Sequence, residues 1–252
     1  MSTGRKQLDI VSLYPKDMNI YGDFGNLKVI EQRTRLYGYE PRIHMYNVGD
    51  AWPARADLIV GGGGQDHGQV SVSKDLFTVS DTLHTLADDS VPILVICGLY
   101  QLFGHYFETV DGARLSGIGI LGVHTVGQKV RMIGNITEHT ARFGDVIGYE
   151  NHSGQTFLDD PSHAWGTVDG GGMGNNGEDH TEGAVYRNVI GTYLHGSLLP
   201  KNPAVADHLI RTAAANRYGN FEDLGGSDEK AQLEKLNSLA DAARKTAMAR
   251  PR

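Results

Sequence analysis

Cys97 is the residue whose type and setting most directly suggest chemistry. It follows the apolar run PILVI, which predicts a buried strand, and it precedes Gly98 and a run with helical spacing. A strand that enters a helix through a sharp turn presents its side chain at the edge of a sheet, as in a nucleophile elbow. The start of a helix also favours the thiolate, which is the reactive form of cysteine. Cys97 is therefore a candidate nucleophile, and a buried structural cysteine is the alternative.

A cysteine nucleophile needs a base, and two of the 11 histidines have suitable settings. His195 comes directly after the apolar strand expected at Val189–Tyr193 and is followed by Gly196. Because neighbouring parallel strands end at the same edge, His195 and Cys97 are expected close together. His152, in the run GYENHSG, is the competing candidate and is expected in a loop. The others lack such a setting, and most are expected at the surface: His44, His67, His84, His105, His124, His139, His163, His180 and His208.

Four consecutive glycines, Gly61–Gly64, follow the apolar run DLIV. Bare backbone N–H groups after a parallel strand can form an anion-binding nest or an oxyanion hole. A phosphate-binding loop is the rival interpretation, but GGGGQDHG lacks the last glycine of the GxGxxG pattern. The chain also lacks the GK[ST] signature of a P-loop. The pattern favours a thiol site and argues against an ATP site.

Composition narrows the class of protein further. The net charge is −7 and the basic residues form no stripe, which argues against nucleic acid as a partner. A single cysteine excludes an internal disulfide and a cysteine-rich metal site, so we expect no metal. The sequence has no apolar window of membrane-spanning length and no signal-peptide pattern. We therefore expect a cytoplasmic protein.

The elements that must position these residues alternate along the first half of the chain. Strands are predicted at 8–13, 42–48, 57–60 and 92–96, and helices at 25–37, 74–88 and 98–106. Asp23 is the expected N-cap of the first helix. This order predicts an α/β fold with an open, mostly parallel sheet flanked by helices.

The second half is richer in strand signals. Strands are predicted at 117–126, 129–137, 145–149 and 189–193, and a helix at 204–218. The composition changes near residue 225, where an amphipathic helix followed by a disordered tail is expected. We therefore divide the chain into one domain, residues 1–224, and a C-terminal helical extension, residues 225–252.

The order of these motifs resembles the class I glutamine amidotransferases. The glycine loop, ICGLYQLFG, GYENHSG and GTYLHGSLLPKNP occur in the order found in their cobyric-acid-synthase-like (CobB/CobQ-type) branch. The runs MNIYGDFGNL and GMGNNGEDHTEG are similar to those of the glutaminase subunits of lipid II isoglutaminyl synthases. The resemblance covers about residues 8 to 217.

The resemblance implies glutamine hydrolysis. Cys97 would attack the side-chain amide and form a thioester, and His195 would relay protons. Backbone N–H groups of Gly98 and of Gly63 or Gly64 would bind the oxyanion, and Arg131 would bind substrate.

It also implies a MurT-like partner of the Mur-ligase family, which forms a heterodimer with this chain. This partner would use ATP to activate the D-glutamate of the lipid II stem peptide, and this chain would carry no cofactor. The protein would then work at the inner face of the membrane.

The sequence differs from the wider family at two positions near the predicted catalytic residues. Many class I amidotransferases carry an acid two residues after the catalytic histidine, where this chain has Ser197. Leu99 also stands where glycine is common. The resemblance implies that the partner subunit supplies the missing acid, and Glu150 is the first candidate within the chain. Two alternative functions remain at this point: a glutaminase for another acceptor, as in cobyrinate-type amidation, and a non-catalytic scaffold subunit.

Overall fold

The computed structural model describes residues 5–64, 66–169, 173–196 and 198–250. A six-stranded sheet forms the centre of the fold, in the order β11-β12-β4-β3-β1-β2, and all its neighbouring strands are parallel except β11 and β12. Its strands are β1 (Gln7–Leu13), β2 (Glu40–Tyr46), β3 (Leu58–Gly61), β4 (Ile93–Ile96), β11 (Ala184–Tyr186) and β12 (Val189–Thr192). The central strands are buried along their length because helices cover both faces.

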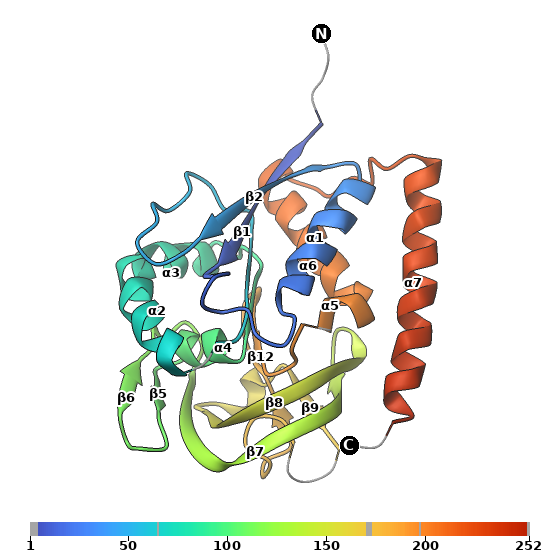
Figure 1. The fold of residues 1–252 in the computed structure, drawn as a ribbon. Helices are drawn as coiled ribbons and strands as arrows, with labels where there is room; N and C mark the ends of the chain where they lie inside the picture. The colour runs from blue at the N-terminus through green and yellow to red at the C-terminus, as the bar shows by residue number, and fades with distance from the viewer. Residues whose placement is uncertain (1–4, 65, 170–172, 197, 251–252) are drawn as a thin grey trace.

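Helices flank this sheet in the manner of an open α/β fold, and the predicted fold class is confirmed. They are α1 (Phe24–Leu36), α2 (Asp66–Thr78), α3 (Ser80–Asp88), α4 (Gly98–Phe103), α5 (Leu198–Lys201), α6 (Pro203–Tyr218) and α7 (Ser227–Met248). In Figure 1, α1 and α6 lie on one side of the sheet, and α2 and α3 lie on the other.

A second sheet, which the sequence suggested only as a run of strands, lies below the first in Figure 1. It contains β5 (Tyr106–Glu108), β6 (Arg114–Ser116), β7 (Val123–Thr140), β8 (Gly144–Leu158), β9 (Gly166–Val168) and β10 (Thr181–Glu182). A short 3-10 helix, Pro161–His163, precedes β9. The long strands β7 and β8 pair in antiparallel fashion, and their register shifts between Gly127 and Met132.

Several predicted elements have different bounds in the structure. The helix expected at 74–88 is two helices, because the chain leaves helical geometry at Val79, the N-cap of α3. Buried apolar side chains continue through the break at Val72, Leu76, Val79 and Leu83, so their spacing does not reveal it. The strands expected at 117–126 and 129–137 are replaced by one strand, β7, which begins at Val123.

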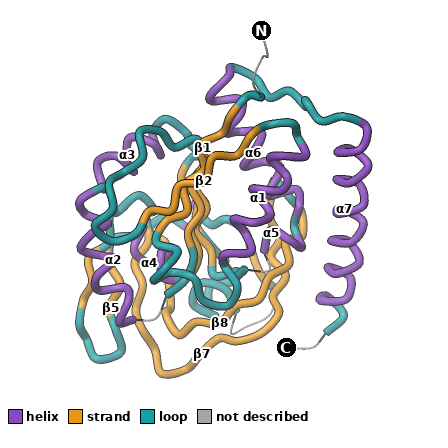
Figure 2. The backbone as a smooth tube through the Cα atoms, turned by 45° about the horizontal axis from the view of Figure 1, so that its top comes forward, coloured by secondary structure: helices purple, strands orange, loops and turns teal. Residues whose placement is uncertain are grey.

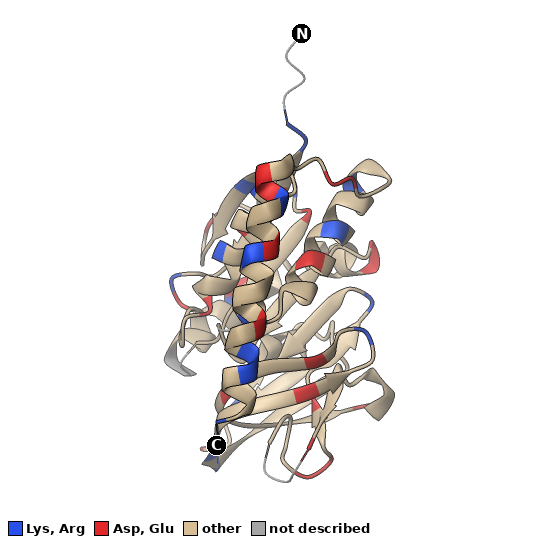
Figure 3. Cartoon of the chain, turned by 90° about the vertical axis from the view of Figure 1, so that its right-hand side faces the viewer, with Lys and Arg blue, Asp and Glu red and all other residues tan. Residues whose placement is uncertain are grey.

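Most of the C-terminal extension is α7, a 22-residue helix that ends at Met248, which leaves few residues for the tail expected after it. α7 runs beside α1 and α5 (Figure 2), and its own residues Leu233 and Ala240 are buried. Arg244 donates a hydrogen bond to the Asp145 carbonyl, at 2.6 Å. Lysine, arginine and acidic residues mark its outward face in Figure 3. Within the described residues, none of the helices combines the length and the apolar character that a membrane span requires.

Candidate active site

Three strand ends of the central sheet meet at the site. β4 pairs in parallel with both β3 and β12, so the segments that follow these strands leave the sheet at one edge. Cys97 follows β4, the glycine loop follows β3, and His195 lies three residues after β12. A Cβ atom added at Gly63 would lie 2.9 Å from Cε1 of His195 and 3.0 Å from Cβ of Cys97. The structure therefore brings the predicted nucleophile, base and glycine loop together.

Cys97 occupies the sharp turn that the sequence predicted. Its backbone has φ 51° and ψ −106°, and α4 begins at the next residue. A positive φ costs a non-glycine residue roughly 1–3 kcal/mol and persists where the surroundings fix it. Here the Cys97 N–H donates to the Thr192 carbonyl at 2.8 Å, which ties the turn to β12. This conformation directs a nearly buried thiol toward the strand ends.

Asp23 supplies a carboxylate to His195. Nδ1 of His195 lies 3.2 Å from each carboxylate oxygen of Asp23, and both side chains are buried. The chain thus contains an acid beside His195 that the sequence-based prediction did not name, since that prediction assigned the acid to the partner subunit or to Glu150. Ser197, at the usual position of that acid, lies outside the described residues.

Asp23 is the N-cap residue of α1, as predicted, but its side chain makes no capping hydrogen bond. The Asn19 side chain instead accepts the N–H of Phe24, at 2.9 Å. The carboxylate of Asp23 is thereby left for the histidine.

The charges around His195 set its protonation. Burial lowers the pKa of His195, but the charge of Cys97 and the hydrogen bond to Asp23 raise this pKa by more, to about 10. With Nδ1 at Asp23, Nε2 is the ring nitrogen left to interact with Cys97. This buried Nε2 has no other hydrogen-bond partner in the described part of the chain. The arrangement favours the imidazolium form of His195 beside Cys97.

The structure distinguishes between Gly63 and Gly64, the two residues of the glycine loop that were predicted as oxyanion donors beside Gly98. The N–H of Gly63 donates to Asp23 at 2.6 Å, so Gly63 is already engaged. The backbone nitrogen of Gly64 would lie 3.1 Å from a Cβ atom added at Gly98. Gly64 and Gly98 therefore remain as the pair of backbone donors beside Cys97.

Arg131 lines the same pocket as Cys97, as its predicted role requires. The register shift before Met132 places it where β7 and β8 separate. Its guanidinium donates to the Asn151 side chain, at 2.7 Å from Nη2, and to the Asn151 carbonyl at 3.2 Å. An exposed cation held in this way suits the carboxylate of a small substrate.

Residues 9–203 match the CobB/CobQ-like glutamine amidotransferase domain. The chain belongs to this family. It is 34% identical over 240 residues to the GatD subunit of a glutamine-hydrolysing lipid II isoglutaminyl synthase from Staphylococcus aureus, covering 94% of this chain and 96% of that one. It is also 34% identical over 244 residues to the subunit of the same name from Streptococcus pneumoniae, covering 93% and 94%.

A solved glutamine amidotransferase from Thermotoga maritima shares the fold, with a TM-score of 0.52 and 14% identity over 95% of this chain and 93% of that chain.

The second candidate base, His152, has a different place in this amidotransferase. It lies within β8 and not in the predicted loop, because the β7–β8 pairing extends through GYENHSG. Its ring stacks on Tyr193 with a centroid separation of 3.5 Å, and Nδ1 lies 2.8 Å from the Gly154 carbonyl. Burial is the largest cause of a pKa for His152 lowered to about 3. His152 thus lines the pocket in its neutral form.

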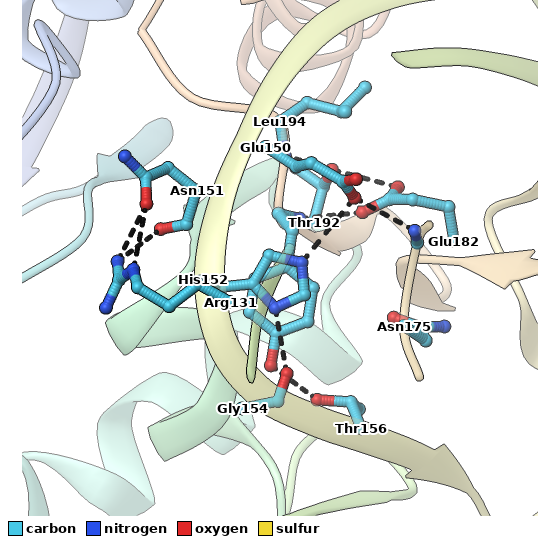
Figure 4. Close-up of polar contacts among 12 residues, drawn as sticks. Arg131, Glu150, Asn151, His152, Gly154, Thr156, Asn175, Glu182, Thr192 and Leu194 are labelled. Carbon is cyan, nitrogen blue, oxygen red and sulfur yellow. Dashed lines mark hydrogen bonds and ion pairs between the residues drawn. The ribbon is translucent and has the colours of Figure 1, made fainter. Parts of the chain in front are cut away.

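Glu150, the in-chain candidate for the acid that orients His195, contacts other groups. Its carboxylate accepts the Gly174 N–H at 2.9 Å and lies 3.6 Å from Nε2 of His152. Figure 4 shows Glu150 and His152 on one side of β8, toward Glu182, and Asn151 on the other side, beside Arg131. The structure therefore places Glu150 beside His152, and places Asp23 beside His195.

Sequence reasoning missed two further pocket residues besides the role of Asp23. Gln69 and Gln101 line the pocket, and Nε2 of Gln69 donates to Oε1 of Gln101 at 3.2 Å. Gln101 in turn donates to the Tyr193 hydroxyl at 3.1 Å. Gln101 lies in ICGLYQLFG, so the resemblance carried a signal for it. Within the described ranges, no cluster of histidine, cysteine or acidic residues could hold a metal ion.

Proposed function

We propose that this chain hydrolyses glutamine to glutamate and ammonia through a thioester on Cys97. The observation that carries the proposal is the meeting of the strained Cys97 turn, His195 and the glycine loop at one edge of the sheet. Membership of the glutamine amidotransferase family supports the choice of glutamine as substrate.

The acylation half of the reaction uses the thiolate–imidazolium pair. Sγ of Cys97 attacks the side-chain amide carbon of glutamine, and the carbonyl oxygen becomes an oxyanion that accepts hydrogen bonds from the N–H groups of Gly98 and Gly64. Nε2 of His195 gives its proton to the amide nitrogen. The carbon–nitrogen bond then breaks, ammonia leaves, and a γ-glutamyl thioester remains.

The deacylation half returns the enzyme to its starting state. Neutral His195 takes a proton from water at Nε2, and the resulting hydroxide adds to the thioester carbon. Collapse of this second oxyanion expels the Cys97 thiolate and releases glutamate. Arg131 holds the α-carboxylate of glutamine throughout, which keeps the amide carbon at Cys97.

The proposal assigns the ammonia to a second subunit. Relatives along nearly the full chain are named subunits of glutamine-hydrolysing lipid II isoglutaminyl synthases, a name that implies a partner. We assign the ATP-dependent step to a MurT-like partner, which would amidate the D-glutamate of the lipid II stem peptide to D-isoglutamine. This chain would need no cofactor of its own and would work in the cytoplasm, at the inner face of the membrane.

The deciding experiment combines the chain with a MurT-like subunit, lipid II, ATP and glutamine. We expect glutamine-dependent amidation with the partner, release of glutamate from glutamine, and no amidation when Cys97→Ser replaces the chain. Amidation supported equally by Cys97→Ser with glutamine as nitrogen source would assign this chain a scaffold role. Amidation of a cobyrinate substrate in place of lipid II would assign a different acceptor.

A further inference from the structure

The segment MNIYGDFGNL, residues 18–27, packs against the two loops that carry the catalytic groups. The N–H of Ile20 donates to the Gly63 carbonyl at 3.1 Å, and Asn26 accepts the N–H of Leu199 at 3.0 Å. A Cβ atom at Gly196 would collide with the backbone of Gly22, so the two segments touch main chain to main chain. Residues 18–27 are thus fixed relative to both the glycine loop and the His195 loop.

Asp23 is the member of this segment whose chemistry is directed at the site. Each carboxylate oxygen lies 3.2 Å from Nδ1 of His195. One of them, Oδ2, also accepts a hydrogen bond from the Gly63 N–H. A buried carboxylate is costly unless it is paired and hydrogen-bonded, and these contacts satisfy both conditions. Because Asn19 takes the helix-capping role, helix formation alone does not account for Asp23.

We propose that Asp23 is the positioning carboxylate of His195, so that this single chain contains the complete set of Cys97, His195 and Asp23. The inference rests on the proposed glutaminase function. Asp23 holds the Nδ1–H tautomer of the neutral ring, which leaves Nε2 to exchange protons with Cys97, substrate and water.

Asp23 also connects the base to the oxyanion donors. Its hydrogen bond to the Gly63 N–H fixes the peptide that precedes Gly64, whose own nitrogen lies beside Gly98. A single carboxylate therefore orients the proton relay and the donor loop together. Tyr21, whose ring meets the His195 ring edge-on at a centroid distance of 4.8 Å, covers the remaining side.

The test compares Asp23→Asn with Asp17→Asn, a matched control at the residue just before this segment. Asp17 is exposed, so its replacement removes the same charge without touching His195. We expect Asp23→Asn to lower kcat for glutamine hydrolysis by roughly 10²- to 10⁴-fold with little change in KM, since a mis-set tautomer in a triad costs about 10⁴-fold. Asp17→Asn should retain the wild-type rate.

The pH profile separates a positioning role from a structural one. The groups that face His195 are Cys97, Asp23, the Tyr21 ring and His152. Without the Asp23 carboxylate, the imidazolium loses its proton more easily, so the alkaline limb of kcat/KM should move to lower pH by about one unit or more. Thermal unfolding of each variant is measured beside the rates.

Asp23→Glu is the second variant, which keeps the charge but moves it by one methylene. We expect it to fold, to lose less activity than Asp23→Asn and to retain the wild-type alkaline limb. A folded Asp23→Asn with wild-type rate and profile overturns the proposal. So does restoration of the Asp23→Asn rate by a MurT-like partner, because the partner then supplies the acid. A wild-type chain inactive both alone and with this partner refutes the underlying glutaminase function instead.

Discussion

His195 and His152 are both buried beside one pocket, yet the structure drives their pKa values in opposite directions. The pKa of His195 is raised to about 10, and the pKa of His152 is lowered to about 3. Burial lowers the pKa in both cases. The difference is that Asp23 and Cys97 place negative charge against His195. The charges of His195 and Arg131 instead lower the pKa of His152 further, against the opposing effect of its hydrogen bond to the Gly154 carbonyl.

The comparison teaches that location in the pocket does not identify the base. Both imidazoles come from segments rich in glycine, and both are within the site. A histidine acts in proton transfer when its charged form is stabilised and one ring nitrogen is left for the substrate. Of the two, only His195 meets both conditions, and His152 serves as a neutral surface stacked on Tyr193.

The largest expected effect on glutamine hydrolysis comes from replacing Cys97, whose charge helps to raise the pKa of His195. Cys97→Ser should lower glutamine hydrolysis by roughly 10⁴-fold or more, because a serine hydroxyl does not form the thiolate at neutral pH. The pKa of His195 should fall as its charged neighbour disappears, while that of His152 stays low. Initial rates and NMR titration of the histidine ring protons measure both. A rate near that of the wild type would refute Cys97 as nucleophile.

Direct replacement of each histidine comes next. His195→Ala should lose at least about 10²-fold in kcat, since general acid–base catalysis contributes that much or more. His152→Ala should lose less, and the remaining activity should keep the wild-type pH profile because His152 does not titrate between pH 5 and 9. Steady-state rates over this pH range decide the order. An inactive His152 variant beside an active His195 variant would reverse the assignment.

Arg131 sharpens the comparison through substrate binding. Arg131→Gln should raise KM for glutamine by about 10- to 100-fold with a smaller change in kcat, as expected when a charge-assisted hydrogen bond of roughly 1.5–3 kcal/mol is lost. The variant also removes a positive charge that lowers the pKa of His152. Lys129→Gln, on the neighbouring exposed position, is the control. Equal KM values in the two variants would remove Arg131 from the substrate site.

The smallest effect tests whether burial favours the neutral form of an acid as it does for His152. Glu138 and Glu182 are fully buried side by side, and burial together with the neighbouring carboxylate raises the pKa of Glu138 well above its usual value. The folded chain therefore binds a proton that the unfolded chain releases above pH about 4.5. The free energy of unfolding therefore falls as the pH rises above that value.

Glu138→Gln should remove this dependence. We expect a Tm above that of the wild type at pH 8 and no such difference near pH 4.5. Thermal unfolding at both pH values provides the measurement. Destabilisation at pH 8 would show that ionised Glu138 is needed for the fold.

Local patterns in the sequence predicted the parts of the site that follow single strands. The PILVI run placed Cys97 at a turn, and the strand before His195 placed the base at the same edge of the sheet. Both predictions depend on neighbours in sequence and on the rule that parallel strands share an edge.

Contacts between distant segments could not be predicted in the same way. Asp23 and His195 are 172 positions apart, and a cap position before a helix gave Asp23 an adequate local explanation. His152 was assigned to a loop because glycine flanks its segment, whereas pairing with β7 makes it a strand. The engagement of Gly63 by Asp23, which leaves Gly64 as the donor, likewise depends on tertiary contact.

The most direct measurement of the central claim is covalent capture of Cys97 by a diazoketone analogue of glutamine. Intact-mass and peptide mass spectrometry of the full chain should show one adduct, on Cys97. Labelling should be much slower in His195→Ala and absent in Cys97→Ser. An unlabelled wild-type chain, or equal labelling of the Cys97→Ser chain, would contradict the assignment of this edge of the sheet as a glutaminase site.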